Sequence, residues 1–244
     1  MTDENINIIR RLSKYYNNDK YFQEDPIIFP KHFAELYKNK KANLKDVEIS
    51  GVIATYLAWG KRNMIVRDAK KAMDEMSWKP YDYVMTHFNP DINSNNDKIS
   101  LHRTIMWSDF TRVCENLKRY YLKYDSIERL STSEIRTEIY GQKPSPSAAN
   151  KKIHLMRRWF VRNDGIVDLG IWKNINPIDL IIPLDVHVHR SALSLEMTSR
   201  KNVSLKTATE ITTLLKLIFP KDPILGDFGL FTVGAVNSKN HLQT

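Results

Sequence analysis

The chain has 244 residues, enough for one domain or for two small lobes that share a cleft. Hydrophobic residues make up 42% and charged residues 27%, and the 8 glycines are too few for a hairpin-rich β protein, so we expect an all-α fold. The single cysteine, Cys114, excludes an internal disulfide and a four-cysteine zinc or iron–sulfur site. The formal net charge of +9 favours a polyanionic partner, although such a charge also serves solubility alone.

Apolar residues recur at intervals of three and four through most of the chain, which predicts helices. The clearest repeat covers 110–121, with Ser108 as its expected N-cap. Two polar stretches, 87–98 and 140–147, interrupt the pattern, and we expect the second to mark a lobe boundary within one unit of residues 1–244. The other predicted helices cover 4–17, 46–58, 61–76, 148–162 and 205–218.

The pattern changes between 159 and 185, where Gly165 and Gly170 punctuate a short connection and Asn176-Pro177 is expected to open another helix. Pro183 then ends an apolar run, and Asp185 stands where the N-cap of a helix over 186–195 belongs. Residues 148–195 are therefore expected to form a helix, a hairpin-like connection and a second helix. For an isolated aspartate, helix capping alone would be the simplest interpretation.

The sequence around Asp185 resembles the aspartate signature of the helix-hairpin-helix DNA glycosylases, in which a proline, an aspartate and a following arginine recur as at Pro183, Asp185 and Arg190. Further motifs resemble the bacterial DUF2400 family over nearly the whole chain. That family is similar to the archaeal 8-oxoguanine DNA glycosylase branch of the superfamily. The motifs are Asp25-Pro26-Ile27, Asp46-Val47-Glu48-Ile49-Ser50-Gly51, Leu57-Ala58-Trp59-Gly60-Lys61-Arg62, Leu101-His102-Arg103-Thr104, Arg158-Trp159-Phe160-Val161-Arg162 and Asp227-Phe228-Gly229-Leu230-Phe231.

The resemblance implies a two-lobed glycosylase fold and an enzyme of base excision repair. Such an enzyme removes 8-oxoguanine from damaged double-stranded DNA and then cleaves the strand as an AP lyase. We expect no cofactor and no obligate protein partner. The acidic and amide-rich start of the chain and its lack of a long apolar run predict no export signal and no membrane span. Together with the resemblance, this implies a cytoplasmic, nucleoid-associated bacterial protein. Two alternatives remain open: a noncatalytic DNA-binding module, and a monofunctional glycosylase that removes another damaged base.

The same resemblance assigns catalytic roles to Asp185 and to a lysine. In the usual layout the lysine follows a glycine-valine-glycine hairpin, which is absent here and leaves only Lys173 in that place. In the archaeal branch the lysine lies earlier, opening a helix with a second basic residue two turns on, and Lys151 with Arg158 matches that arrangement. Lys151 is therefore the expected nucleophile, and Lys152 remains a close competitor.

One face of this predicted helix gathers polar residues. We expect Arg158 and Arg162, together with Arg190, to contact DNA, and the two arginine charges to disfavour a third positive charge at Lys151. A solvated face with no ligand is the simpler interpretation, and the apolar surroundings of Lys152 favour that residue instead. The members of the face are Lys151, His154, Arg158 and Arg162.

Three residues are candidates for holding an extruded base. Trp59 and Phe228 could sandwich a purine and Gln23 could read an amide edge, although core packing and plain surface exposure explain such residues equally simply. His187 and His189 stand two positions apart on a predicted helix, so they point to different sides, and no third ligand accompanies them. We therefore expect no metal site.

Overall fold

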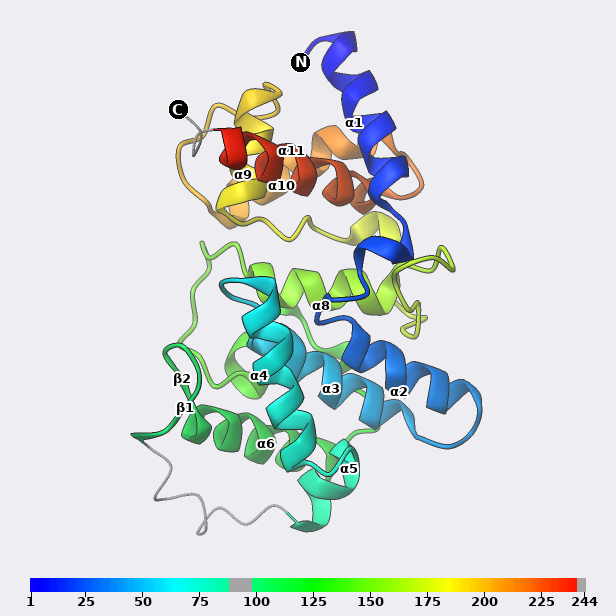
Figure 1. Cartoon of the computed structure of the whole chain (residues 1–244), viewed down its shortest axis with the longest axis vertical. Helices are drawn as coiled ribbons and strands as arrows, with labels where there is room; N and C mark the ends of the chain where they lie inside the picture. The colour runs from blue at the N-terminus through cyan, green and yellow to red at the C-terminus, as the bar shows by residue number, and fades with distance from the viewer. Residues whose placement is uncertain (88–97, 241–244) are drawn as a thin grey trace. The chain divides into compact units, whose positions relative to one another are not determined.

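The structure is a computed structural model that describes residues 1–87 and 98–240. Helices account for 62% of it, and the described residues contain one small two-stranded sheet, which confirms the all-α class (Figure 1). Of the polar stretch predicted at 87–98, residues 88–97 lie outside the description. No helix within the described ranges has both the length and the apolar character needed to cross a bilayer.

The chain divides into two compact units. One consists of Phe22–Pro144, and the other combines Met1–Tyr21 with Ser145–Thr244. The junction at Pro144 lies inside the stretch 140–147 singled out above, whereas the junction at Tyr21 has no counterpart among the sequence predictions. Each unit is described by itself.

The Phe22–Pro144 unit is built around α3 (Leu44–Tyr56), whose residues from Asp46 onward are all buried. Helices α2 (Ile28–Lys38) and α4 (Arg62–Glu75) pack against it, as expected for a helix that is buried along nearly its whole length. Strands β1 (Ser100–His102) and β2 (Ile105–Met106) pair in antiparallel fashion. The remaining elements are α5 (Pro80–Asp82), η2 (Tyr83–His87), α6 (Trp107–Tyr121), η4 (Ile127–Arg129), α7 (Thr132–Glu134) and η5 (Ile135–Ile139).

Helix α6 confirms the clearest of the predicted repeats, because its apolar positions Phe110, Val113 and Leu117 are buried. Its predicted cap is wrong. The N-cap is Met106 rather than Ser108, since the helix begins directly after β2 and the carboxylate of Asp109 accepts the Met106 amide at 2.9 Å.

In the other unit, α11 (Gly226–Asn240) packs against both α1 (Asp3–Tyr16) and α9 (Val186–Ser194) (Figure 1). A side chain at Gly229 would place its Cβ 2.6 Å from the Ser13 hydroxyl, so glycine permits this close approach of α1.

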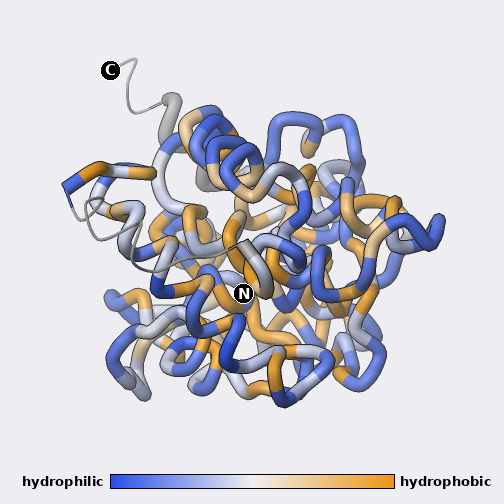
Figure 2. Tube along the Cα trace, turned by 90° about the horizontal axis from the view of Figure 1, so that it is seen from below, coloured by the Kyte–Doolittle hydropathy of each residue, from blue (hydrophilic) through white to orange (hydrophobic). Residues whose placement is uncertain are grey.

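Apolar and polar stretches alternate along the helical trace, as amphipathic packing requires (Figure 2). The remaining elements are η1 (Asp19–Tyr21), α8 (Lys151–Val161), η6 (Pro177–Asp179), α10 (Leu205–Ile218) and η7 (Pro223–Leu225).

All the helices predicted by residue range are confirmed in α1, α3, α4, α6, α8, α9 and α10, but among the longer helices α2 and α11 were not predicted. Pro30 obscures α2, yet it lies in the first turn, where a missing amide hydrogen costs little. Glycines obscure α11, and packing against two other helices outweighs its weak intrinsic propensity. Conversely, Asn176-Pro177 opens only the single 3₁₀ turn η6, so the full helix expected there is wrong.

Candidate active site

Helix α8 begins at Lys151 because Asn150 interrupts the preceding backbone. Asn150 has a φ of 47°, a left-handed conformation that asparagine tolerates better than most residues. Its carbonyl oxygen accepts the amide hydrogens of Ile153 and His154, both at 3.0 Å, which starts the helical ladder. Lys151 is thereby placed in the first turn, with its side chain 30% exposed.

Asp185 is the N-cap of α9, as its position after Pro183 predicted. Its Oδ1 accepts the backbone amides of His187 at 2.9 Å and Val188 at 3.0 Å. Two such bonds satisfy donors that the first helical turn would otherwise leave open and hold the carboxylate in one orientation. The other oxygen, Oδ2, accepts neither of these cap amides.

Lys151 at the start of α8 lies close to Asp185 at the start of α9. The Nζ of Lys151 lies 3.8 Å from Oδ2 of Asp185, and the Asp185 side chain is 23% exposed. This is an ion-pair distance rather than a hydrogen bond, so the amine is close to the carboxylate but is not tightly held by it. Lys152 is half-buried, and the exposed Lys173 donates to the carbonyl oxygen of Gly170. The structure thus brings together the predicted catalytic residues, whose catalytic role stays a prediction.

Arg158, two turns after Lys151 on α8, lies in a buried network of ion pairs. Its guanidinium is 3.2 Å from Asp168 and donates to Asp227 at 2.6 Å. Burial is the main cause that raises the pKa of Asp227, and the negative charge of Asp185 adds to it. The catalytic candidate and the network are therefore electrostatically connected.

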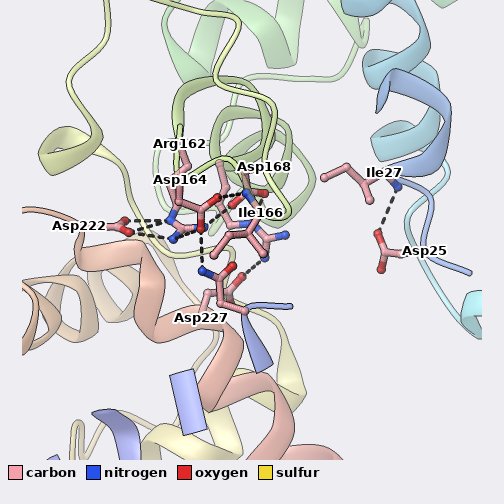
Figure 3. A network of polar contacts seen from close by, with 10 residues as sticks. Asp25, Ile27, Arg162, Asp164, Ile166, Asp168, Asp222 and Asp227 are labelled. Carbon is pink, nitrogen blue, oxygen red and sulfur yellow. Dashed lines mark hydrogen bonds and ion pairs between the residues drawn. The ribbon is translucent and has the colours of Figure 1, made fainter. Parts of the chain in front are cut away.

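Arg162 occupies the centre of the same network (Figure 3). It contacts Asp168 at 2.7 Å, Asp164 at 2.8 Å and Asp222 at 2.8 Å, and Asp222 receives bonds from both Nε and Nη2. Burial of Asp164 opposes its ionisation, but the charge of Arg162 and the hydrogen bonds from Arg162, Asn17 and the Ile166 amide together hold the pKa of Asp164 below its ordinary value. Such forked pairing is geometrically specific for arginine.

These contacts correct two expectations about Arg158 and Arg162. Their exposures are 5% and 2%, so the predicted outward basic face is wrong, and a DNA phosphate would have to displace carboxylates from buried guanidiniums. Four aspartates surround the two arginines, so the network does not supply the predicted excess of positive charge. The four, to which the sequence assigned no site role, are Asp164, Asp168, Asp222 and Asp227.

The base-binding candidates fall into different surroundings. Phe228 is 3% exposed, with the guanidiniums of Arg158 and Arg162 lying 4.6 and 5.1 Å from its ring centroid. It is a core residue that supports the network, so the predicted stacking surface at Phe228 is wrong. Trp59 is 45% exposed and Gln23 is also exposed, but both belong to the Phe22–Pro144 unit, and their roles stay predictions.

On α9, Arg190 is exposed and remains available to a ligand. His189 is buried, and its Nε2 lies 2.8 Å from the carbonyl oxygen of Arg200, which ties the helix to the following loop. Within the part of the chain that the structure describes, no group of three or more His, Cys, Asp or Glu side chains is arranged to hold a metal ion.

His154 lies one turn after Lys151 and is 3% exposed, and its Nε2 has no hydrogen-bond partner among the described residues. Burial, reinforced by the charge of Arg157, lowers the pKa of His154 from 6.5 to about 4. The unfolded chain therefore takes up a proton on this imidazole as the pH falls from 6.5 towards 4, and the folded chain does not. The stability that the buried neutral imidazole of His154 contributes is fully present above pH 6.5 and is lost on acidification to pH 4.

We expect the free energy of unfolding of the parent to fall by roughly 3 kcal/mol more than that of His154→Gln between pH 7 and pH 4, since each pKa unit corresponds to about 1.4 kcal/mol. Urea unfolding at a series of pH values measures the difference. The variant retains every other acid-sensitive group, so its pH dependence is the background against which the parent is compared. Parallel stability curves for the two proteins would contradict the assignment.

Comparison with protein families gives a match to the model described as "Protein of unknown function (DUF2400)", over residues 25–143 and 131–236. These two segments cover most of the chain and include Lys151, Asp185 and the whole buried network. Comparisons with curated proteins and with solved structures gave no match.

Proposed function

Because the chain belongs to the DUF2400 family, whose description names no activity, we propose its function from the geometry of Lys151 and Asp185. We propose a bifunctional DNA glycosylase that excises 8-oxoguanine from double-stranded DNA and then acts as an AP lyase. The observation that carries the proposal is the 3.8 Å separation between the Lys151 amine and an Asp185 carboxylate that its helix cap holds in place.

The proposed reaction begins once the damaged nucleotide has left the base stack. The neutral amine of Lys151 attacks C1′ of the deoxyribose, the bond from C1′ to the base breaks, and the base departs with the bonding electrons and takes up a proton from water. Oδ2 of Asp185 stabilises the positive charge that develops on the sugar and accepts a proton from the attached amine. The bond from C1′ to O4′ then breaks, O4′ takes the proton held by Asp185, and the nitrogen lone pair completes the Schiff base. Loss of a proton from C2′ eliminates the 3′ phosphate.

The two carboxylate oxygens of Asp185 have different contacts, and this difference supports the mechanism. Oδ1 is committed to two amides of α9, while Oδ2 faces Lys151. A carboxylate fixed before the reaction does not have to reorganise when charge develops beside it, which is the basis of electrostatic preorganisation. The half-buried position of both side chains leaves them within reach of a ligand while limiting the water around them.

We further propose that α8, its connection and α9 form the helix-hairpin-helix element of the glycosylase superfamily. The connection folds back on α8, because the amides of Leu169 and Trp172 donate to the carbonyl oxygens of Trp159 and Phe160 at 2.7 and 2.8 Å. Arg190 on α9 then contributes to phosphate binding, together with the overall charge of +9. Arg158 and Arg162 support the catalytic residues from within the core.

Incubating the protein with a panel of duplexes, each carrying one damaged base, tests the proposal. We expect excision and strand cleavage at 8-oxoguanine, and we expect Asp185→Asn to slow single-turnover excision by about a hundredfold or more because it removes the negative charge. Asparagine is as good an N-cap as aspartate, so the melting temperature should change little.

Asp179→Asn is the matched control, since Asp179 is an exposed aspartate in η6 and its variant should excise at the parental rate. Parental activity in Asp185→Asn would remove the carboxylate from the mechanism. Tight duplex binding without excision of any lesion would instead identify a noncatalytic binding module.

A further inference from the structure

The Phe22–Pro144 unit contains a cavity of about 550 Å³ between α6, the residues that follow it and η5. Its volume falls in the range of pockets that hold small molecules and is large enough for a mononucleotide. Three cations line it, Arg112, Arg119 and Lys123, against one carboxylate, Glu138. Arg112 and Arg119 on α6, and Lys123 just after its end, lie along one side of the helix. This side is opposite the apolar side that faces the core.

The cations on this wall are positioned by buried groups. Asn116 is 6% exposed, and its side-chain amide donates to the Ile139 carbonyl oxygen at 3.0 Å while its oxygen accepts from Arg119. Arg112 donates to Asp109 at 2.6 Å and to the Tyr56 hydroxyl at 3.2 Å. The two guanidiniums are thus held before any ligand arrives, which reduces the entropy lost on binding.

Donor capacity remains on these cations. The Nε of Arg112 is buried and has no hydrogen-bond partner among the described residues. Lys123 is exposed and forms no ion pair with a residue that the structure describes. Arginine and lysine that retain free donors in a concave site are suited to the oxygens of a phosphate group.

The rim of the cavity depends on an unusual backbone. Thr137 and Glu138 belong to η5, a π-helical turn of a kind that is frequent at functional sites. Gly141 has a φ of 62°, and a Cβ there would lie 2.9 Å from the Arg112 Nε and 3.2 Å from the Asn116 amide. Any side chain at this position would therefore press on the residues that line the cavity.

Two aromatic residues complete the lining. Tyr120 and Tyr124 have ring centroids 4.8 Å apart, and both line the cavity. From the cations, the tyrosines and the volume, we propose that this cavity binds the phosphate group of a nucleotide. The nucleotide is either free or part of a nucleic acid strand, and the two sources share the same chemistry.

Isothermal titration with guanosine 5′-monophosphate, with guanosine and with a short undamaged DNA duplex tests the proposal. We expect the monophosphate to bind at least about tenfold more tightly than guanosine, and Arg119→Gln and Lys123→Gln each to weaken it about tenfold, because each removes a charged phosphate contact. Both positions are exposed, so melting temperatures should stay close to the parental value. Lys118→Gln, the same charge change on α6 outside the cavity lining, should leave binding unchanged.

Binding of the duplex but not of the monophosphate, with the same response to the three variants, supports the site and assigns the phosphate to a nucleic acid strand. Three results overturn the proposal: no binding of either ligand, parental binding in both cavity variants, or an equal loss in Lys118→Gln. None of these measurements depends on base excision, so failure here is distinguishable from failure of the proposed glycosylase activity.

Discussion

Lys151→Gln is expected to abolish covalent trapping of the protein on damaged DNA. Borohydride reduces the Schiff base formed during turnover, and only an amine that has attacked C1′ can form that imine. Glutamine has no nucleophilic amine, so we expect the trapped adduct to disappear and excision to fall at least about a thousandfold. Gel electrophoresis of borohydride-treated reactions on an 8-oxoguanine duplex measures the adduct.

Lys152→Gln and Lys173→Gln are the matched controls, because they make the same change in the half-buried neighbour and in the lysine of the ordinary superfamily layout. Both should still trap. Undiminished trapping in Lys151→Gln, together with its loss in one of the controls, would transfer the nucleophile to that residue. Excision by the parent without any adduct would mean that water attacks the sugar and that the enzyme is monofunctional.

Arg162→Met should cause the largest loss of stability. Methionine approximates the length of the side chain but leaves Asp168, whose side chain is fully buried, and its neighbours Asp164 and Asp222 without the guanidinium that they share. Breaking a buried ion pair from one side typically costs about 3–5 kcal/mol, and here Arg158 alone is left to compensate the buried Asp168. Urea unfolding at neutral pH measures the change.

Arg162→Lys should lose less, since it keeps the charge but cannot make the forked contact with Asp222. Arg190→Met is the control for the loss of one positive charge, and we expect a change within about 0.5 kcal/mol because Arg190 is exposed. Equal stabilities of Arg162→Met and Arg190→Met would contradict the structural role of the network. A selective loss of DNA affinity in Arg162→Met, at parental stability, would restore the original prediction of a phosphate contact.

The amino-acid sequence by itself determined most of the helices and the position of Asp185. These features depend on interactions within a few residues: the three-four repeat of 110–121 gives α6, and a carboxylate after Pro183 caps the next helix. The same local reasoning predicted the helix over 148–162 that corresponds to α8, whereas the expected role of Lys151 came from the family resemblance. Where a tertiary contact competes with a local preference, as at Gly229 of α11, the local signal is lost.

Only the tertiary structure decided which faces of these helices are covered. Helical spacing puts Arg158 and Arg162 on one side of α8, but it carries no information about Asp222 and Asp227, which lie 60 and 69 positions away from their arginine partners. A sequence read segment by segment therefore presents a basic face, whereas folding encloses it with carboxylates and with the ring of Phe228. The physical reason is that periodicity fixes the direction of a side chain relative to its own helix, while burial and charge compensation depend on the elements that pack against that helix.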